Sequence, residues 1–148
     1  MTRYRVLIVE DDPFISADLE GVLSDAGCEV CGVAASEWVA LKMAEATRPP
    51  FAVVDLRLSP GDGRVVAREL YQRYGTAILL ATAHVNDLED LAATGALGCL
   101  PKPYVPEDVP FALRDIYDLR EGRPGPRLLD HLIALNRWAS GGPAIGRP

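Results

Sequence analysis

The sequence has few cysteines, an excess of acidic over basic residues, and no long apolar run. Three cysteines are an odd set with no spacing typical of a disulfide framework, which favours a reducing, cytoplasmic location. Lys and Arg number 15 against 21 Asp and Glu, so the net charge of -6 argues against direct binding of nucleic acid. No apolar stretch approaches the roughly 18 residues of a membrane-spanning helix, so we expect no membrane insertion.

Two of the cysteines, Cys28 and Cys31, have the C-x-x-C spacing of thioredoxin-like redox sites. That chemistry requires the first thiol at a helix amino terminus, where the thiolate is stabilised. Here the pair lies along a predicted strand, in which positions i and i+3 point to opposite faces. We therefore interpret both residues as small buried side chains.

A glycine-rich or Ser/Thr-rich phosphate loop is also missing after the first apolar run. Glu10, Asp11 and Asp12 stand there instead. Three acids would repel a bound phosphate group, whereas a flavodoxin-like cofactor or redox protein would need a loop that attracts one. That class of function is set aside.

Short apolar runs alternate with helical patterns over the first 120 residues. We predict strands at about 4–9, 29–34, 51–55, 77–81 and 97–100, and helices at about 13–26, 36–48, 64–74, 86–93 and 107–120. Each parallel strand step needs a crossover, so this order predicts an α/β fold with a parallel five-stranded sheet and helices on both faces. At 148 residues, the chain has the size of one domain.

The end of the chain differs in composition, and we divide the sequence into a domain at 1–121 and an extension at 122–148. Gly- and Pro-rich stretches flank an apolar segment that we predict to be a short helix over about 127–139, followed by a flexible end. Such a helix is too apolar to stay free in water. We expect it to pack on its own domain or on another chain, as in a homodimer.

Polar residues follow four of the predicted strands. Glu10 and Asp11 follow the first, Asp55 ends the third, Thr82 follows the fourth and Lys102 follows the fifth. The carboxyl ends of parallel strands lie along one edge of a sheet, which is where open α/β folds place their sites. We therefore expect these side chains to emerge together.

Converging carboxylates repel one another unless a cation lies among them, and Mg²⁺ is a natural occupant because it prefers oxygen ligands. We predict Asp11 and Asp55 as direct ligands and a main-chain carbonyl beside Arg57 as a third. Glu10 would reach the ion through water or orient Asp11. The alternative is a group of solvated loop acids, since short loops before helices often carry an Asp as a cap.

Asp55 is the candidate nucleophile. A carboxylate can attack phosphorus and form an acyl phosphate if the charge on the phosphoryl oxygens is stabilised. Lys102 offers a positive charge and Thr82 a hydroxyl donor for that purpose. Taken singly, Thr82 would be a strand-end hydroxyl and Lys102 a surface lysine, but their joint spacing favours a phosphoryl site.

These residues together resemble the receiver domains of two-component response regulators over about residues 4–120. The motifs are Glu10-Asp11-Asp12-Pro13, Asp55, Ala81-Thr82-Ala83 and Lys102-Pro103 with its cis-proline. The resemblance implies a flavodoxin-like, doubly wound sheet with strand order 2-1-3-4-5 and a need for Mg²⁺. It also implies phosphoryl transfer to Asp55 from a sensor histidine kinase or histidine phosphotransfer protein, and no catalysis beyond the protein's own phosphorylation and dephosphorylation.

No output domain is visible after the receiver pattern. We therefore expect a single-domain response regulator that signals through phosphorylation-dependent contacts with a downstream protein target, or by phosphorelay. The alternative is a receiver-fold binding module that acts without phosphorylation. Loss of a site residue would favour that alternative, and none is lost.

The sequence departs from the common receiver pattern at its switch residues. Cys99 stands where many receivers carry an aromatic residue that changes rotamer when the threonine, here Thr82, engages phosphate. Tyr104 could serve instead, with packing in its loop as the alternative. Arg57 and His84 occupy positions that tune the access of water to the phosphoryl group in this family, and their bulk suggests slow dephosphorylation.

Overall fold

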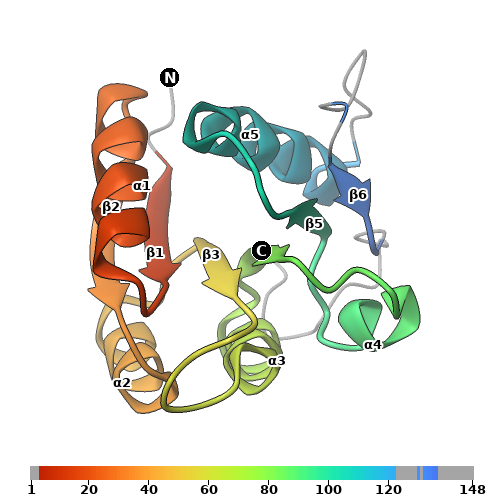
Figure 1. The fold of residues 1–148 in the computed structure, drawn as a ribbon, viewed down its shortest axis with the longest axis horizontal. Helices are drawn as coiled ribbons and strands as arrows, with labels where there is room; N and C mark the ends of the chain where they lie inside the picture. Colours follow the sequence, from red (N-terminus) through yellow and green to blue (C-terminus); the bar gives the residue numbers. More distant parts are fainter. Residues whose placement is uncertain (1–3, 123–129, 131, 137–148) are drawn as a thin grey trace.

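A parallel sheet lies between two layers of helices (Figure 1). The computed structural model describes residues 4–122, 130 and 132–136. The parallel strands are β1 (Arg5–Val9), β2 (Glu29–Ala34), β3 (Phe51–Asp55), β4 (Ala77–Thr82) and β5 (Gly98–Pro101). They pair in the order β2-β1-β3-β4-β5, which confirms the predicted fold class and strand order.

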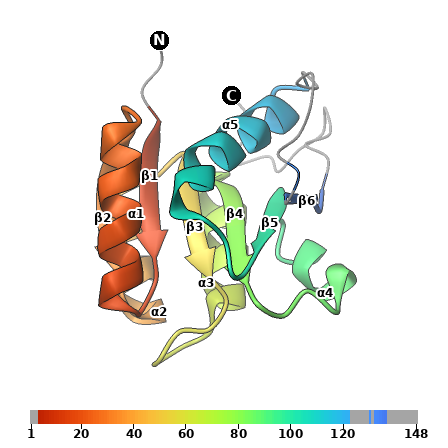
Figure 2. The ribbon, with the colours of Figure 1, turned by 45° about the horizontal axis from the view of Figure 1, so that its top comes forward.

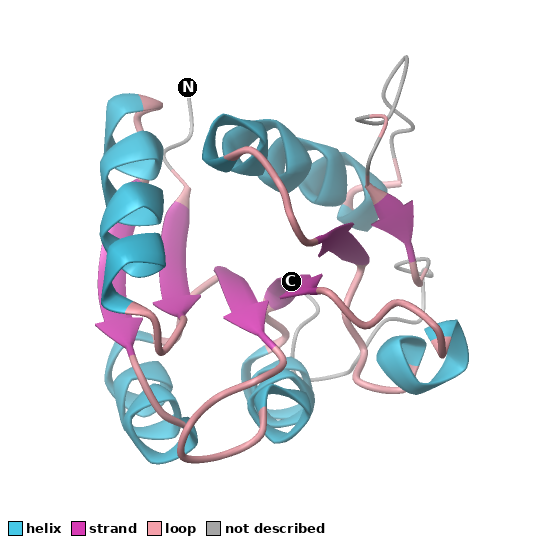
Figure 3. Cartoon of the chain, viewed as in Figure 1, coloured by secondary structure: helices cyan, strands magenta, loops and turns pink. Residues whose placement is uncertain are grey.

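The helices are divided between the two faces of this sheet (Figure 2). They are α1 (Pro13–Asp25), α2 (Glu37–Thr47), α3 (Gly63–Tyr74), α4 (Leu88–Ala92) and α5 (Val109–Arg120), with a single 3-10 turn, η1 (Pro106–Asp108), before α5. Figure 3 shows how strands and helices alternate along the chain. One face carries α1 and α5, and the other carries α2, α3 and α4.

The loops after β1 and β3 lead into α1 and α3, and an aspartate caps each of these two helices. The Asp12 carboxylate accepts the N–H groups of Phe14 and Ile15 at 2.8 and 3.2 Å. Asp62 accepts the N–H of Arg64 at 2.8 Å. Each cap satisfies amide groups that the first helical turn leaves unpaired. The caps therefore fix the points at which the loops that carry the strand-end acids end and the helices begin.

Helices on both faces bury nearly all of β1, β3 and β4, as their continuous apolar sequences predict. Each face has its own apolar cluster, and these clusters contain Leu19 and Leu113 on the α1/α5 side and Ala44 and Leu70 on the other. No helix in the described part of the chain is long and apolar enough to cross a membrane.

Cys28 and Cys31 contact opposite faces, as predicted. Cys28 packs against the α1/α5 cluster and Cys31 against the α2/α3/α4 cluster. Neither is fully buried, however, and both thiols are free. The prediction of two buried side chains was therefore too strong. The reason is that β2 is an outer strand, which the helices cover less completely than the central ones.

The end of the chain contradicts the prediction of a helix at 127–139 where the structure describes it. Ile133–Ala134 form β6, which pairs antiparallel with β5. Among the described residues the sheet thus has six strands, with one antiparallel edge, rather than five parallel ones. Without β6, the outer edge of β5 would expose unpaired N–H and C=O groups. Pairing with that edge outweighs the helical pattern. Residues 127–129, 131 and 137–139 lie outside the described part.

Candidate functional site

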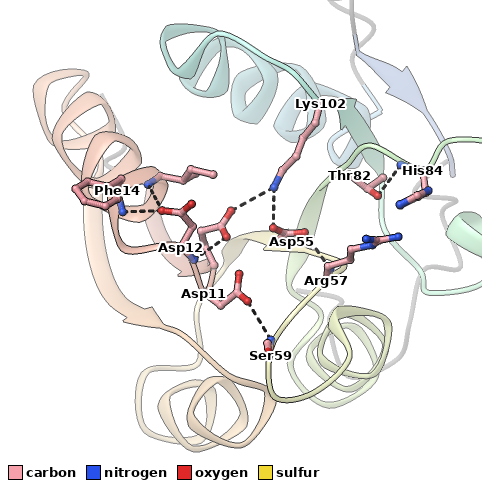
Figure 4. Close-up of polar contacts among 11 residues, drawn as sticks. Asp11, Asp12, Phe14, Asp55, Arg57, Ser59, Thr82, His84 and Lys102 are labelled. Atoms are coloured by element: carbon pink, nitrogen blue, oxygen red, sulfur yellow. Dashed lines mark hydrogen bonds and ion pairs between the residues drawn. The ribbon is translucent and has the colours of Figure 1, made fainter.

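The structure brings the predicted strand-end residues together at the carboxyl edge of the sheet (Figure 4). The centre of the site is Asp55, whose residue is 7% exposed at the end of β3. The Lys102 ammonium donates to Asp55 Oδ2 at 2.7 Å and lies 3.5 Å from Glu10 Oε1. A single cation of the chain therefore contacts two carboxylates that the fold keeps from solvent.

Three acids form a cluster that fits a divalent cation. Glu10, Asp11 and Asp55 each offer a carboxylate oxygen, and these oxygens lie within 4.8 Å of one another. Such a set of hard oxygen donors suits Mg²⁺, which binds few carboxylates and keeps several waters.

Main-chain amides hold these carboxylates in place. Glu10 Oε2 accepts the N–H of Asp12 at 3.0 Å. Asp55 Oδ1 accepts the N–H of Arg57 at the same distance. Asp11 Oδ2 accepts the N–H of Ser59 at 3.1 Å, which ties the loop after β1 to the loop after β3. The acids are thus oriented by the backbone of two loops before any ligand arrives.

The surroundings raise the pKa of both Glu10 and Lys102, but for different reasons. Burial raises the pKa of Glu10 to about 7, and the neighbouring Asp55 charge adds to this effect. Burial also disfavours the Lys102 ammonium, but the hydrogen bond and charge of Asp55 outweigh it and raise the pKa of Lys102. Lys102 therefore stays charged at neutral pH, while Glu10 exchanges its proton close to neutrality.

We expect the stability of the metal-free protein to fall as the pH rises from the ordinary Glu10 pKa of 4.5 to about 7. In this window the folded state holds a proton on Glu10 that the unfolded state has released, so a rising pH favours unfolding. The check is urea unfolding in chelator at a series of pH values, for the wild type and for Glu10→Gln. The variant should lose this part of the pH dependence, and parallel curves for the two proteins would contradict the assignment.

Thr82 is 2% exposed at the end of β4. Its hydroxyl oxygen accepts the N–H of His84 at 3.0 Å (Figure 4). The hydroxyl is thus bonded to the β4–α4 loop while Lys102 is bonded to Asp55. In the same region, the N–H of Lys102 donates to the Thr82 carbonyl at 2.8 Å, which joins the ends of β4 and β5.

The two other predicted switch residues lie on opposite sides of the sheet. Cys99 is fully buried in the α2/α3/α4 cluster, and burial raises its pKa to about 11. Tyr104 packs against the α1/α5 cluster and, with Ile15 and Pro106, lines a cavity of about 410 Å³. The Lys102–Pro103 peptide before it is cis, as the receiver resemblance implies.

The Tyr104 hydroxyl is buried and has no hydrogen-bond partner in the part of the chain that the structure describes. Burial, with added effects from Glu10 and Asp55, raises its pKa to about 12, so the hydroxyl keeps its proton. An unpaired buried donor is costly. Of Cys99 and Tyr104, the residue with an unused polar group is Tyr104, the one that the sequence offered in place of the usual aromatic switch.

Two residues of the site were missed in the sequence. Gly63 begins α3 beneath Asp55, and a Cβ atom there would collide with the Asp55 carbonyl oxygen and the Leu56 Cα. Glu37 at the start of α2 accepts the N–H of Asp62 at 3.0 Å and so fixes the loop after Asp55. The signal for the glycine was the turn-rich run Gly61-Asp62-Gly63, but no local pattern links Glu37 to a loop that follows it by more than 20 residues.

The family profile of the response regulator receiver domain matches residues 6–114. The chain belongs to this family. It therefore contains a receiver domain of two-component signalling, and its flavodoxin-like fold is the one that the family shares.

Similar proteins carry this domain as one part of a longer chain. The transcriptional regulatory protein PdtaR of Mycobacterium tuberculosis is 33% identical over 107 residues, which cover 71% of this chain and 52% of PdtaR. Protein-glutamate methylesterase/protein-glutamine glutaminase 3 of Hahella chejuensis is 32% identical over 120 residues, covering 77% of this chain and 34% of that protein. This chain thus spans about half or less of the length of these two relatives.

Two solved receiver structures match over nearly their whole length. The chemotaxis response regulator CheY4 of Vibrio cholerae superimposes with a TM-score of 0.69 at 28% identity, over 78% of this chain and 99% of CheY4. A CheY-like receiver domain protein of Methanospirillum hungatei gives a TM-score of 0.72 at 25% identity, over 82% of this chain and 98% of that one.

Proposed function

We propose that this receiver domain accepts a phosphoryl group on Asp55 in a Mg²⁺-dependent reaction and signals through the resulting change of shape. The observation that carries the proposal is the convergence of three acids with Lys102, whose ammonium lies 2.7 Å from Asp55 Oδ2. Solvated loop acids would not need a partly buried lysine that contacts two of them.

In this proposal Asp11 and Asp55 would hold Mg²⁺ directly, with the main-chain carbonyl of Arg57, and Glu10 would act through water or by orienting Asp11. A bound Mg²⁺ neutralises charge on the phosphoryl oxygens. The amides of Asp12 and Ser59 keep the acids pointed at the site, so little reorganisation precedes binding.

The covalent step forms a bond between an Asp55 carboxylate oxygen and phosphorus, while the bond from phosphorus to the donor breaks with its electron pair. When the donor is a phosphohistidine, the imidazole nitrogen leaves. Lys102 passes from the carboxylate to a phosphoryl oxygen, which is within reach of its flexible stem. The Thr82 hydroxyl turns from the His84 amide and donates to another oxygen. Water later cleaves the acyl phosphate.

The movement of Thr82 would link phosphorylation of Asp55 to a change at the protein surface. Once its hydroxyl releases the N–H of His84, the β4–α4 loop and the surface from residue 86 to 100 can shift toward a partner-binding form. Cys99 is too small to act as an aromatic switch. We assign that part to Tyr104, whose buried hydroxyl lacks a partner in the described structure.

The donor in this proposal is a sensor histidine kinase or a histidine phosphotransfer protein, and the recipient of the signal is a downstream protein. In this proposal the chain acts in the cytoplasm as a regulator or a phosphorelay intermediate, alone or as a homodimer. It transforms no other substrate. The net charge of -6 disfavours nucleic acid as a direct target.

The decisive experiment is intact mass after incubation with acetyl phosphate and Mg²⁺. We expect the wild type to gain the mass of one phosphoryl group, and we expect no gain with excess chelator or in the Asp55→Asn control, which keeps the shape of the side chain but lacks the nucleophile. A folded wild type that gains no mass, either from acetyl phosphate or from a phosphorylated histidine phosphotransfer domain, would contradict the proposal. That result would favour a binding module that acts without phosphorylation.

A further inference from the structure

The outer edge of β5 is occupied by the chain's own carboxyl-terminal segment. We call residues 132–136 the strap. Within it, β6 pairs antiparallel with β5, Ile133 facing Cys99 and Ala134 facing Gly98. The N–H of Leu135 continues the pairing by donating to the Leu97 carbonyl at 2.9 Å. Figure 2 shows β6 beside β5, at the end of the sheet.

The strap wraps around this edge and contacts both apolar clusters. Leu132 is 8% exposed and packs on the α1/α5 side, where Gly98 leaves room for it beside Ile116. Ile133 and Leu135 pack against the cluster on the opposite side. The segment is therefore held by apolar contacts on two faces as well as by main-chain pairing.

Asn136 links the strap to the end of α4 and to the chain just before β5. Its side-chain amide donates to the carbonyl of Ala92, the last residue of α4, at 2.9 Å. The same amide donates to the carbonyl of Ala96, just before β5, at 2.7 Å. Both hydrogen bonds require a fixed distance between the end of α4 and the start of β5. A displacement of either element by about an ångström breaks at least one of them.

These two elements are the ones that lead to the polar site. The chain runs from Thr82 through His84 to α4, and from β5 to Lys102. Thr82 and Lys102 are the groups that exchange partners when Asp55 carries a phosphoryl group in the proposed function. A change at the site therefore acts on both carbonyls, those of Ala92 and Ala96, that accept hydrogen bonds from the Asn136 amide.

We infer that the outer edge of β5 is a docking surface for an extended segment, closed by the strap in the unphosphorylated chain and opened when Asp55 is phosphorylated. This inference rests on the proposed function and names the surface through which it signals. The opened edge offers N–H and C=O groups flanked by two apolar strips. Its partner is an extended protein segment that adds as a strand and carries apolar side chains on both sides, as the strap does.

The competing view is a static cover, in which the strap stays on β5 in every state. Linkage separates the two. If phosphorylation weakens the strap, then removal of the strap's contacts must strengthen binding at Asp55 by the same factor. A static cover has no such coupling, so its loss leaves the affinity at Asp55 unchanged.

The first measurement is hydrogen exchange of backbone amides in the full chain, with and without phosphorylation, and with intact mass recorded on the same samples. We expect the Leu135 amide to lose about 10-fold or more in protection when the phosphoryl group is present. Amides of β1, far from the strap, should keep theirs. Unchanged protection of Leu135 in a sample that has gained phosphoryl mass would overturn this inference and leave the proposed function standing. A sample that gains no mass refutes the proposed function, and the inference falls with it.

The second measurement is the affinity of Asp55 for beryllofluoride, a noncovalent phosphoryl analogue, in the presence of Mg²⁺. Asn136→Ala removes both hydrogen bonds to Ala92 and Ala96 and should raise that affinity about 10-fold. Arg73→Ala is the matched control, because it removes an exposed side-chain contact with Glu69 on α3 and should leave the affinity unchanged. Equal affinities in Asn136→Ala and the wild type would overturn the inference.

Discussion

Replacement of Lys102 by methionine is expected to slow phosphorylation of Asp55 by acetyl phosphate about 100-fold, the usual cost of one lost donor to a developing negative charge. Methionine keeps an unbranched stem of similar length but removes the ammonium that lies 2.7 Å from Asp55 Oδ2. The phosphoryl oxygens then meet the carboxylates of the site without the cation that the chain itself supplies. The measurement is the initial rate of mass gain at saturating Mg²⁺.

The chain offers a close control for this substitution. Its only other lysine is Lys42, an exposed residue of α2 whose ammonium lies 5.7 Å from the centre of the Trp38 ring. Lys42→Met makes the same chemical change far from the site and should leave the rate as in the wild type. If Lys102→Met reacts within twofold of the wild type, the lysine has no part in stabilising the transferred group.

Replacement of Gly63 by alanine is expected to destabilise the fold by about 3 kcal/mol, at the upper end of the cost of overpacking. The added methyl group would meet the Asp55 carbonyl oxygen and the Leu56 Cα, which are backbone atoms and cannot rotate away. The N–H of Gly63 also donates to the Leu56 carbonyl at 2.9 Å, so the start of α3 is held against the end of β3. Urea unfolding of the two proteins measures the change.

Gly21→Ala provides the opposite case. Gly21 lies within α1, and a Cβ atom there would meet no atom within 4 Å. Alanine is a better helix former than glycine by about 1 kcal/mol, so this variant should be more stable than the wild type.

A Gly63→Ala protein as stable as the wild type would show that β3 and α3 can separate at no cost. In that event, the hydrogen bond from Gly63 to Leu56 would not hold the start of α3 against the end of β3.

The sequence predicted most of the sheet because its signal is local. The runs Val6-Leu7-Ile8-Val9 and Ala77-Ile78-Leu79-Leu80-Ala81 are apolar at every position, which only strands covered on both faces require. The polar residues that follow such runs had to share an edge, and the structure places Asp55 and Lys102 in contact there. The rule that the carboxyl ends of parallel strands lie along one edge of a sheet was thus enough to predict the site from the sequence.

The parts that were missed depend on contacts between distant segments. Leu132, Ile133 and Leu135 are spaced in a way that suits a helix as well as a strand, and only the free edge of β5 decides between them. Likewise, Glu37 looks like an ordinary acid in a first helical turn, since its bond to Asp62 exists only after α2 and α3 pack side by side. Tertiary contacts decide both features: they override the helical pattern at 132–135, and they give Glu37 a partner that its own helix does not supply.

The short β6 strand also bears on how copies of this protein behave when they are crowded together. A sheet grows by adding strands to an edge, and a longer edge offers a better template. Within the described residues β6 consists of Ile133 and Ala134, which offer a second molecule little backbone to pair with, whereas β5 beneath it is twice as long. The same few residues therefore act as a solubility device, and a chain that lacked them would tend to associate edge to edge at high concentration.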